Sequence, residues 1–420
     1  MIDSIRSIED EKVKGKTILL RVDLNSSVKT SQELVSAGDK PKYRHGRLLK
    51  SPKLAAHART IRYLAGEGAR VIVLSHQGRK GRDDFIDLSA HQRTLERLTD
   101  LEVGFFRWDE DYLSAIKKMK DGSVILLDNT RFLEFEAENR KPEEHAREPV
   151  IRDLAGVADL FVLDALSVAH RSHATVVGFT VLLPSFAGPV LVSELEALRK
   201  IETVKDNGLL ILGGMKPEDS LRVMKRMLSE KRVSRVLLGG ALGELAIIAK
   251  GSTLGEKDRF LEEKGILSSL EEMKRLLGRF NGLVSFPVDL AIRRKGQREE
   301  ISLAELPVEE MIYDVGEITV QNYESFINKA DLVIFNGPLG RFESYQFAYG
   351  TRKILEALCR TRAYTIVGGG DTVTAVVRLG FKDKEFNHVS LAGKALLEFL
   401  LGEKLPGLVA LSTNNSFTLK

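Results

Sequence analysis

Two glycine-rich segments in the second half of the chain each follow a short apolar run. The run Asp331–Phe335 leads into Asn336-Gly337-Pro338-Leu339-Gly340, and the run Tyr364–Val367 leads into Gly368-Gly369-Gly370-Asp371. Glycine lets backbone approach a phosphate closely, and the N-terminus of a helix that follows such a turn favours an anion. A carboxylate at the end of the turn, such as Asp371, suits a metal ion or a ribose hydroxyl. The two turns together predict a nucleotide site.

Basic and histidine side chains follow apolar runs in the first half of the chain. Guanidinium groups bind carboxylates and phosphates through paired hydrogen bonds. If the apolar runs are parallel strands of one sheet, their carboxyl ends share one edge, where ligands bind in such folds. The sequence therefore predicts a local cationic pocket for a small phosphorylated acid, formed by Arg21, His76, Arg79, Arg131, His170 and Arg171.

Each of these signals has a simpler structural explanation when it is taken alone. An arginine after a strand often serves a surface ion pair, a histidine can be a satisfied core residue, and paired glycines can just permit a tight turn. His91, in a helical stretch, is interpreted as structural. A functional interpretation is favoured because so many of these residues fall together at the carboxyl ends of predicted strands.

Composition restricts the class of protein. The chain has 420 residues, with 63 Lys and Arg against 59 Asp and Glu, and its formal charge is +4. That charge is too small to imply nucleic-acid or membrane partners, and no apolar run has membrane-spanning length. The single cysteine, Cys359, excludes an intramolecular disulfide. We expect a cytoplasmic protein with small-molecule substrates, monomeric, with a dimer as the alternative.

The elements that must position these residues alternate regularly along the chain. Short β-rich runs are separated by longer amphipathic segments, which predicts an α/β fold of βαβ units with parallel sheets. About ten strand candidates favour two sheets of five or six strands over one large sheet. A boundary is expected near Pro184–Pro189, before a charged helix that bridges the halves. No Walker A or G-x-G-x-x-G motif follows a strand, which argues against a P-loop NTPase and a typical dehydrogenase.

The ordered set of motifs resembles the phosphoglycerate kinases, in particular their archaeal branch, over nearly the whole chain. Arg131 falls in the family's N-x-R-F position, and Ala169–His173 resembles its A-H-R segment. Gly213–Ser220 resembles the G-G-x-K nucleotide turn. The remaining matches are two substrate loops, Arg21–Asn25 and Ser75–Arg79, and two diagnostic nucleotide motifs, Asn336–Glu343 and Gly368–Asp371.

The resemblance implies an activity and an architecture. The activity is reversible phosphoryl transfer between the acyl phosphate of 1,3-bisphosphoglycerate and ADP, with Mg²⁺, giving 3-phosphoglycerate and ATP. The architecture is two Rossmann-like domains that face each other across a cleft and are joined by a hinge helix. The expected phosphoglycerate-binding domain spans residues 1–188, with 397–420 returning to pack on it, and the nucleotide-binding domain spans 189–396.

The resemblance also implies roles for single residues. Phosphoglycerate would be held by Asp23, Asn25, Lys53, His76, Arg79, Arg131 and Arg171. Lys216, Lys53 and Arg171 would act on the transferring phosphoryl group, Glu343 would contact the ribose, and Asp371 would contact the Mg²⁺-nucleotide. The full nucleotide set is Gly214, Lys216, Gly239, Gly240, Asn336, Pro338, Glu343, Gly368, Gly369, Gly370, Asp371 and Thr372.

Three positions depart from the family's pattern. Lys53 stands where the family has an arginine, and it keeps the charge without the planar fork. Leu163–Ser167 replaces N-D-A-F-G, and Ser390–Ala395 replaces the final S-T-G-G-G-A turn, which removes a hydroxyl and two glycines. These departures leave an alternative open, namely a catalytically impaired nucleotide-binding paralogue. A kinase for another small carboxylate is a further alternative, and a nucleotide-dependent dehydrogenase is a remote one.

Overall fold

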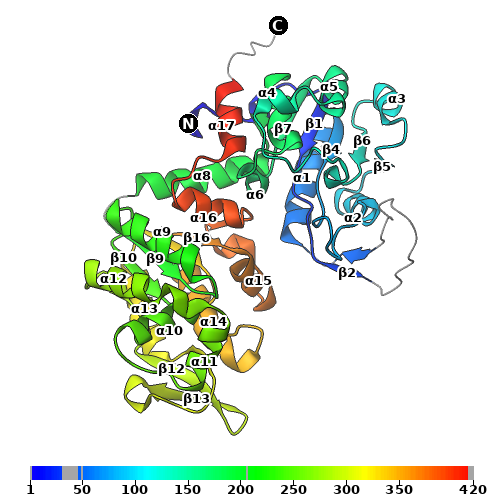
Figure 1. Cartoon of the computed structure of the whole chain (residues 1–420). Helices are drawn as coiled ribbons and strands as arrows, with labels where there is room; N and C mark the ends of the chain where they lie inside the picture. The colour runs from blue at the N-terminus through cyan, green and yellow to red at the C-terminus, as the bar shows by residue number, and fades with distance from the viewer. Residues whose placement is uncertain (1, 31–45, 49–50, 205–206, 415–420) are drawn as a thin grey trace. The chain divides into compact units, whose positions relative to one another are not determined.

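The computed structural model describes residues 2–30, 46–48, 51–204 and 207–414. The chain forms two compact units (Figure 1): unit one is Met1–Leu195 with Lys404–Lys420, and unit two is Glu196–Glu403. The chain enters unit two within helix α8 (Pro189–Thr203) and leaves it after helix α16 (Lys394–Leu400). Both crossings lie a few residues beyond the expected bounds at 188 and 396, and residues 415–420 lie outside the described part of the chain.

Unit one contains a parallel sheet with the strand order β5-β6-β4-β1-β7-β8, six strands within the described residues. Every residue of β1, β6 and β7 is buried, which is typical of a parallel sheet covered on both faces. The strands are β1 (Thr17–Arg21), β4 (Arg70–Leu74), β5 (Val103–Phe106), β6 (Val124–Leu127), β7 (Leu160–Leu163) and β8 (Ser185–Ala187). The helices are α1 (Pro52–Gly66), α2 (Ser89–Thr99), α3 (Tyr112–Lys117), α4 (Pro142–His145), α5 (Pro149–Gly156), α6 (Leu166–Ala169), α7 (Ala174–Val177) and α17 (Pro406–Thr413).

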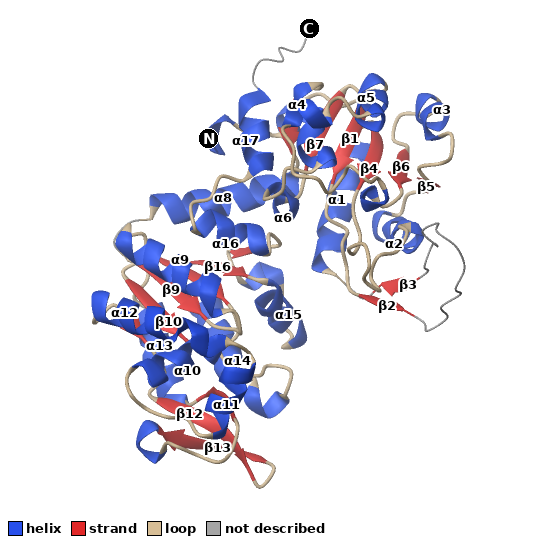
Figure 2. Cartoon of the chain, in the orientation of Figure 1, coloured by secondary structure: helices blue, strands red, loops and turns tan. Residues whose placement is uncertain are grey.

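Unit two contains a second parallel sheet, with the order β11-β10-β9-β15-β16-β17 among its described residues. Figure 2 shows its strands among helices, as βαβ units require. The strands are β9 (Gly208–Leu212), β10 (Arg235–Leu238), β11 (Val284–Ser285), β15 (Leu332–Asn336), β16 (Tyr364–Gly368) and β17 (His388–Val389). The helices are α9 (Pro217–Ser229), α10 (Gly240–Ala249), α11 (Glu256–Glu263), α12 (Leu270–Arg279), α13 (Glu317–Ile327), α14 (Tyr349–Arg360), α15 (Gly370–Arg378) and α16.

The expected α/β class and the expectation of two parallel sheets are confirmed, but the structure adds elements that the sequence did not predict. An antiparallel sheet of β12 (Asp289–Arg294), β13 (Gln297–Ser302) and β14 (Ile312–Val315) is inserted in unit two. Strands β5 and β8 were also missed. In unit one, β2 (Val28–Thr30) pairs with β3 (Gly46–Leu48) in a short antiparallel ribbon.

Each unit has its own hydrophobic core. In unit one, Leu20, Val73 and Val162 of the sheet pack with Ile61 and Leu64 of α1, all without exposed surface. In unit two, the core includes Ile211, Phe335, Val367, Ile354 and Leu358. Burying one such side chain contributes roughly 1.5–3 kcal/mol, so the two cores hold the sheet edges rigidly.

The chain's return to unit one is fixed by α17 and the residue after it. Helix α17 packs against α6, α7 and β8. Asn414 is buried, and its Oδ1 accepts from the backbone N–H of Ser185 at 2.7 Å while its Nδ2 donates to the carbonyl of Leu183 at 3.0 Å. Within the part of the chain described, no helix is long and apolar enough to cross a membrane.

Candidate active site

The predicted substrate residues lie at the carboxyl edge of the unit-one sheet. They are carried by loops after four neighbouring parallel strands, so the topology brings them to one edge. Asp23 and Asn25 follow β1, His76 and Arg79 follow β4, Arg131 lies in a turn after β6, and Arg171 follows α6, the helix after β7; Lys53 is in the first turn of α1.

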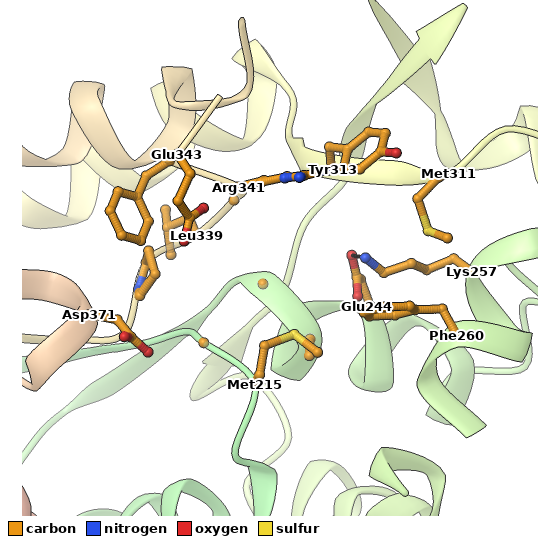
Figure 3. A pocket seen from close by; sticks show the side chains of 16 residues that line it. Met215, Glu244, Lys257, Phe260, Met311, Tyr313, Leu339, Arg341, Glu343 and Asp371 are labelled. Carbon is orange, nitrogen blue, oxygen red and sulfur yellow. Dashed lines mark ion pairs between the residues drawn. The ribbon is translucent and has the colours of Figure 1, made fainter. Parts of the chain in front are cut away.

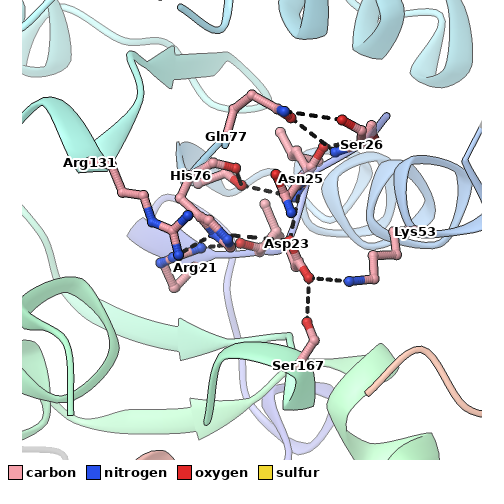
Figure 4. A network of polar contacts seen from close by, with 12 residues as sticks. Arg21, Asp23, Asn25, Ser26, Lys53, His76, Gln77, Arg131 and Ser167 are labelled. Atoms are coloured by element: carbon pink, nitrogen blue, oxygen red, sulfur yellow. Dashed lines mark hydrogen bonds and ion pairs between the residues drawn. The ribbon is translucent and has the colours of Figure 1, made fainter. Parts of the chain in front are cut away.

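The carboxylate of Asp23 is the most strongly held group at this edge (Figure 4). Lys53 donates from Nζ to Oδ2 at 2.5 Å, and Ser167 donates from Oγ to the same oxygen. The backbone N–H of Asn25 donates to Oδ1 at 3.1 Å. Burial works in the opposite direction, but the charge of Lys53 and the hydrogen bonds from Lys53 and Ser167 hold the pKa of Asp23 far below its usual range. Asp23 is therefore a fixed anionic acceptor.

His76 is a neutral donor beside this carboxylate. Arg21 is almost completely buried, and its Nη2 lies 3.2 Å from Nδ1 of His76. Since an arginine can only donate, Nδ1 accepts and the imidazole proton is on Nε2. Burial lowers the pKa of His76 well below its ordinary value, and the charges of Arg21, Arg131 and Arg171 lower it further, while Asp23 opposes them.

The arginines of this edge lie close enough to affect each other's ionisation. Burial lowers the pKa of Arg131 to about 10, and the charges of Arg171, Arg21 and Arg79 lower it further. Burial and nearby arginines likewise lower the pKa of His173 to about 3. Positive groups that repel one another in a partly buried place are stabilised by a bound anion. This sheet edge therefore carries a cluster of positive charges on a nearly neutral chain.

Unit two presents glycine turns at the corresponding edge of its sheet. The turn after β9 and the turn after β15 touch, since Gly213 donates its N–H to the carbonyl of Asn336 at 3.0 Å. A Cβ atom on Gly213 would lie 2.3 Å from the carbonyl oxygen of Pro338, and one on Gly337 would lie 2.3 Å from that of Gly213. Only glycine fits at either place, so the two turns can pack with their backbones in direct contact.

The turn after β16 completes this edge. Gly369 precedes α15 with a φ of 90°, and Thr372 in the first turn accepts from the N–H of Gly337 through Oγ1 at 2.7 Å. The Nδ2 donor of Asn336 is buried and has no hydrogen-bond partner among the described residues. Free donors beside a helix N-terminus suit a phosphate group.

A pocket of about 470 Å³ opens beside these turns (Figure 3). It brings together five of the predicted nucleotide residues, Gly214, Gly240, Pro338, Glu343 and Asp371. Its volume suits a small-molecule ligand. Its other lining residues are Met215, Ala241, Glu244, Lys257, Phe260, Met311, Tyr313, Leu339, Gly340, Arg341 and Phe342.

Comparison with known proteins identifies the family. The family model described as phosphoglycerate kinase matches residues 8–403. The chain belongs to the phosphoglycerate kinase family. The phosphoglycerate kinase of Methanopyrus kandleri is 36% identical over 416 residues, covering 98% of each chain, and that of Archaeoglobus fulgidus is 37% identical over 411 residues, covering 97% of this chain and 96% of its own. The crystal structure of the phosphoglycerate kinase from Pyrococcus horikoshii superposes with a TM-score of 0.88 at 33% identity, covering 98% of this chain and 99% of its own.

The remaining residues expected from the resemblance to phosphoglycerate kinases lie close to the same turns. Gly239, Gly368 and Thr372 are buried under the turns, whereas Lys216 and Gly370 are exposed, with Lys216 just before α9. His91, interpreted as structural, is buried, and its Nε2 lies 3.1 Å from Oε1 of Gln77. That these residues bind the nucleotide stays a prediction.

The departures from the phosphoglycerate kinase pattern have clear structural settings. Lys53 and Ser167, two of the altered positions, meet on the same oxygen of Asp23. In the Ser390–Ala395 turn, the left-handed φ of 57° falls on Gly393, where glycine is retained. Ala392 and Lys394 do not have positive φ, so the missing glycines cause no backbone strain there. Lys394 is largely exposed and pairs with Glu398 at 3.0 Å.

Several polar residues that hold the predicted substrate residues in place were not found from the sequence. Thr175 accepts from Nε of Arg21 at 2.9 Å and donates to Glu136 at 2.6 Å, so it links the arginine to a buried carboxylate. Gln77 joins the loops after β1 and β4 by accepting from the N–H of Ser26 and donating to its carbonyl. Ser167 ends the Leu163–Ser167 segment and Thr175 lies just after Ala169–His173, but uncharged hydroxyl residues give no signal of their own.

Proposed function

We propose that this chain transfers a phosphoryl group reversibly between 1,3-bisphosphoglycerate and ADP, giving 3-phosphoglycerate and ATP. Members of its family are ATP:3-phospho-D-glycerate 1-phosphotransferases of glycolysis and gluconeogenesis. The observation that carries the proposal is the gathering of basic side chains beside the fixed carboxylate of Asp23, where burial and the charges of Arg171, Arg21 and Arg79 lower the pKa of Arg131. No finding favours the alternative of an impaired paralogue.

The carboxyl edge of the unit-one sheet is proposed to hold phosphoglycerate by complementary charge. Arg79, Arg131 and Arg171 suit the phosphate and carboxylate groups of the substrate. Asp23 is itself an anion and repels these two groups. Its acceptor oxygens suit the substrate hydroxyl group that lies between the phosphate and the carboxylate. Lys53 can contact both Asp23 and the substrate. It neutralises the Asp23 carboxylate and still has ammonium donors for a substrate oxygen.

The unit-two turns are proposed to hold the nucleotide. The backbone of Gly368–Gly370, Asn336 and the start of α15 suit the phosphates, and Glu343 suits the ribose. Lys216 is proposed to contact the transferring phosphoryl group. Asp371, an exposed carboxylate in the first turn of α15, fits Mg²⁺ because this ion is usually held by one or two carboxylates plus substrate phosphates. Among the described residues, no cluster of three or more acidic, histidine or cysteine side chains offers a metal site independent of the nucleotide.

The chemistry requires no general base. The attacking oxygen belongs to a carboxylate or a phosphate and is already anionic, so the protein must position the groups and neutralise charge. Burial keeps His76 and His173 neutral near pH 7 because it lowers the pKa of each. Bound Mg²⁺ would neutralise phosphate charge on the nucleotide. The arginines and lysines would neutralise the charge of the substrate groups that they contact.

A coupled assay with ATP, Mg²⁺ and 3-phosphoglycerate tests the proposal directly. We expect robust turnover with 3-phosphoglycerate and background rates with other small carboxylates such as acetate. Turnover of another carboxylate alone would contradict the proposed substrate. Absence of all turnover, with nucleotide binding intact by calorimetry, would contradict the proposed activity. A cytoplasmic location and a monomeric state complete the proposal, and sedimentation analysis tests the latter.

A further inference from the structure

One end of the unit-two pocket has a polar pair that none of the proposed roles uses. Glu244 of α10 and Lys257 of α11 are both buried, and Nζ of Lys257 lies 3.1 Å from Oε1 of Glu244. Lys257 also donates to the carbonyl of Ile312 at 2.8 Å. Figure 3 shows the pair on the side of the pocket away from Asp371.

The second carboxylate oxygen of Glu244 is an unused acceptor. Oε2 is buried and has no hydrogen-bond partner among the described residues, although Glu244 lines the pocket. A buried acceptor without a partner is costly, and natural proteins contain few of them. Burial raises the pKa of Glu244, and Lys257 opposes that change. A ligand that donates to Oε2 would remove the cost.

The surroundings of this oxygen fit a flat heterocycle. Phe260, Met311 and Leu339 line the pocket, and the Lys257 ammonium lies 4.9 Å from the centre of the Phe260 ring. The phosphate-binding turns and Asp371 occupy the other end, so a nucleotide bound there would direct its base toward Glu244. This step rests on the proposed nucleotide site.

We propose that Glu244 selects the base of the nucleotide, with Oε2 accepting an N–H from the 6-amino group of adenine. A 6-oxo purine would place an oxygen against this oxygen instead. Lys257 acts as a positioning residue because it holds the other carboxylate oxygen and anchors it to β14. The site therefore discriminates 6-amino from 6-oxo purine nucleotides.

Calorimetric titration of the full chain with ADP, IDP and purine-riboside diphosphate tests this inference. We expect ADP to bind about tenfold or more tightly than either analogue, because a hydrogen bond to a charged group is lost. In the variant E244Q, the amide oxygen stays on Lys257, because an ammonium can only donate, so the amide NH2 faces the base. This group donates to a 6-oxo purine and cannot accept from a 6-amino group, so the preference for ADP over IDP should fall to one or below. The matched control E256Q, on the same helix as Lys257 and outside the pocket lining, should keep the wild-type ratio.

A second variant guards against a folding defect in E244Q. The double substitution E244M/K257M replaces the pair with apolar side chains of similar length, and it should bind all three nucleotides without discrimination. An unchanged ADP to IDP ratio in E244Q or in the double variant would overturn the inference, while turnover by the wild type would leave the proposed function standing. Equal wild-type affinities for ADP and IDP would also overturn it. Failure of every nucleotide to bind would overturn both.

Discussion

At the scale of single residues, the carboxyl edge of the unit-one sheet has its charges set before a substrate binds. Asp23 is kept ionised by Lys53 and Ser167, and His76 is kept neutral by burial. The positive charges of Arg171, Arg21 and Arg79 repel that of Arg131, and a bound anion would offset this repulsion. Such fixed charges lower the reorganisation needed when phosphate charge develops in the transition state.

Lys216 is the residue whose loss should affect catalysis most in unit two. It is exposed before α9, so replacing it removes little packing. We expect Lys216→Ala to lower kcat by ~10²–10³ while thermal unfolding stays unchanged, because one positioned charge is lost in the transition state. The control Lys274→Ala removes a surface lysine of α12 and should keep wild-type kcat. Near-wild-type turnover in K216A would contradict the role of Lys216.

Where a side chain follows a strand, its place at the sheet edge could be predicted from the sequence. Asp23, His76 and Arg131 could be placed because the end of a parallel strand fixes the sheet edge. Glu244 and Lys257 could not, because each lies on a helix, and only the packing of α10 and α11 against the pocket brings them together. Helical periodicity marks them as polar positions and gives no information on their partners.

At the scale of elements, the strands were the most predictable part. Apolar runs such as Leu332–Phe335 become fully buried strands because both faces of a parallel sheet are covered. The β12–β13 hairpin was missed because β13 is largely exposed and contains Arg298, Glu299 and Glu300. These charged residues weaken the apolar signal of a strand, and their pairing with β12 stabilises it instead.

The contact between the β15 turn and helix α15 should depend on one hydroxyl. Thr372→Val removes the acceptor for the N–H of Gly337 and leaves that buried donor unsatisfied. We expect a loss of roughly 1–3 kcal/mol in the free energy of unfolding and a raised KM for ATP. Thr372→Ser keeps the hydroxyl and is the control. Equal KM values in the valine and serine variants would show that the hydroxyl is not needed.

Helix α2 should make unit one sensitive to acid through His91. Burial lowers the pKa of His91 to about 4, whereas the unfolded chain protonates it near 6.5. The stability from the neutral histidine is therefore present above pH 6.5 and is lost as pH falls toward 4. Between pH 7 and pH 5 this loss is about 2 kcal/mol, and His91→Gln should remove that part of the slope. Urea unfolding followed by Trp108, the sole tryptophan and part of unit one, measures it. An unchanged slope would refute the assignment.

At the scale of the whole molecule, the chain returns to close unit one. Asn414 ties the end of α17 to the strand β8 and to the turn before it. This return was expected from the family resemblance alone, since residues 404–414 carry no motif. The physical reason appears only in the fold, where Asn414 satisfies buried backbone groups.

Asn414→Ala should weaken unit one specifically. The substitution removes the Asn414 partner of two buried backbone groups, the N–H of Ser185 and the carbonyl of Thr180. The carbonyl of Leu183 loses one donor and keeps the Ser185 hydroxyl. We therefore expect a loss of about 2–4 kcal/mol in the free energy of unfolding. Trp108 fluorescence in urea reports this unit, and the exposed neighbour Thr413→Ala is the control. The same unfolding midpoint in N414A and wild type would contradict the role of Asn414.

Unit one is built from two separate segments of the chain, and this sets the order in which the two units can be completed during synthesis. Unit two is one continuous segment, Glu196–Glu403, and all of its strands can pair once that segment has left the ribosome. Unit one still lacks α17 at that moment, although its sheet was translated first. The part of the protein made earliest is therefore the part finished last, and a nascent chain stopped before residue 404 would carry a complete unit two beside an unfinished unit one.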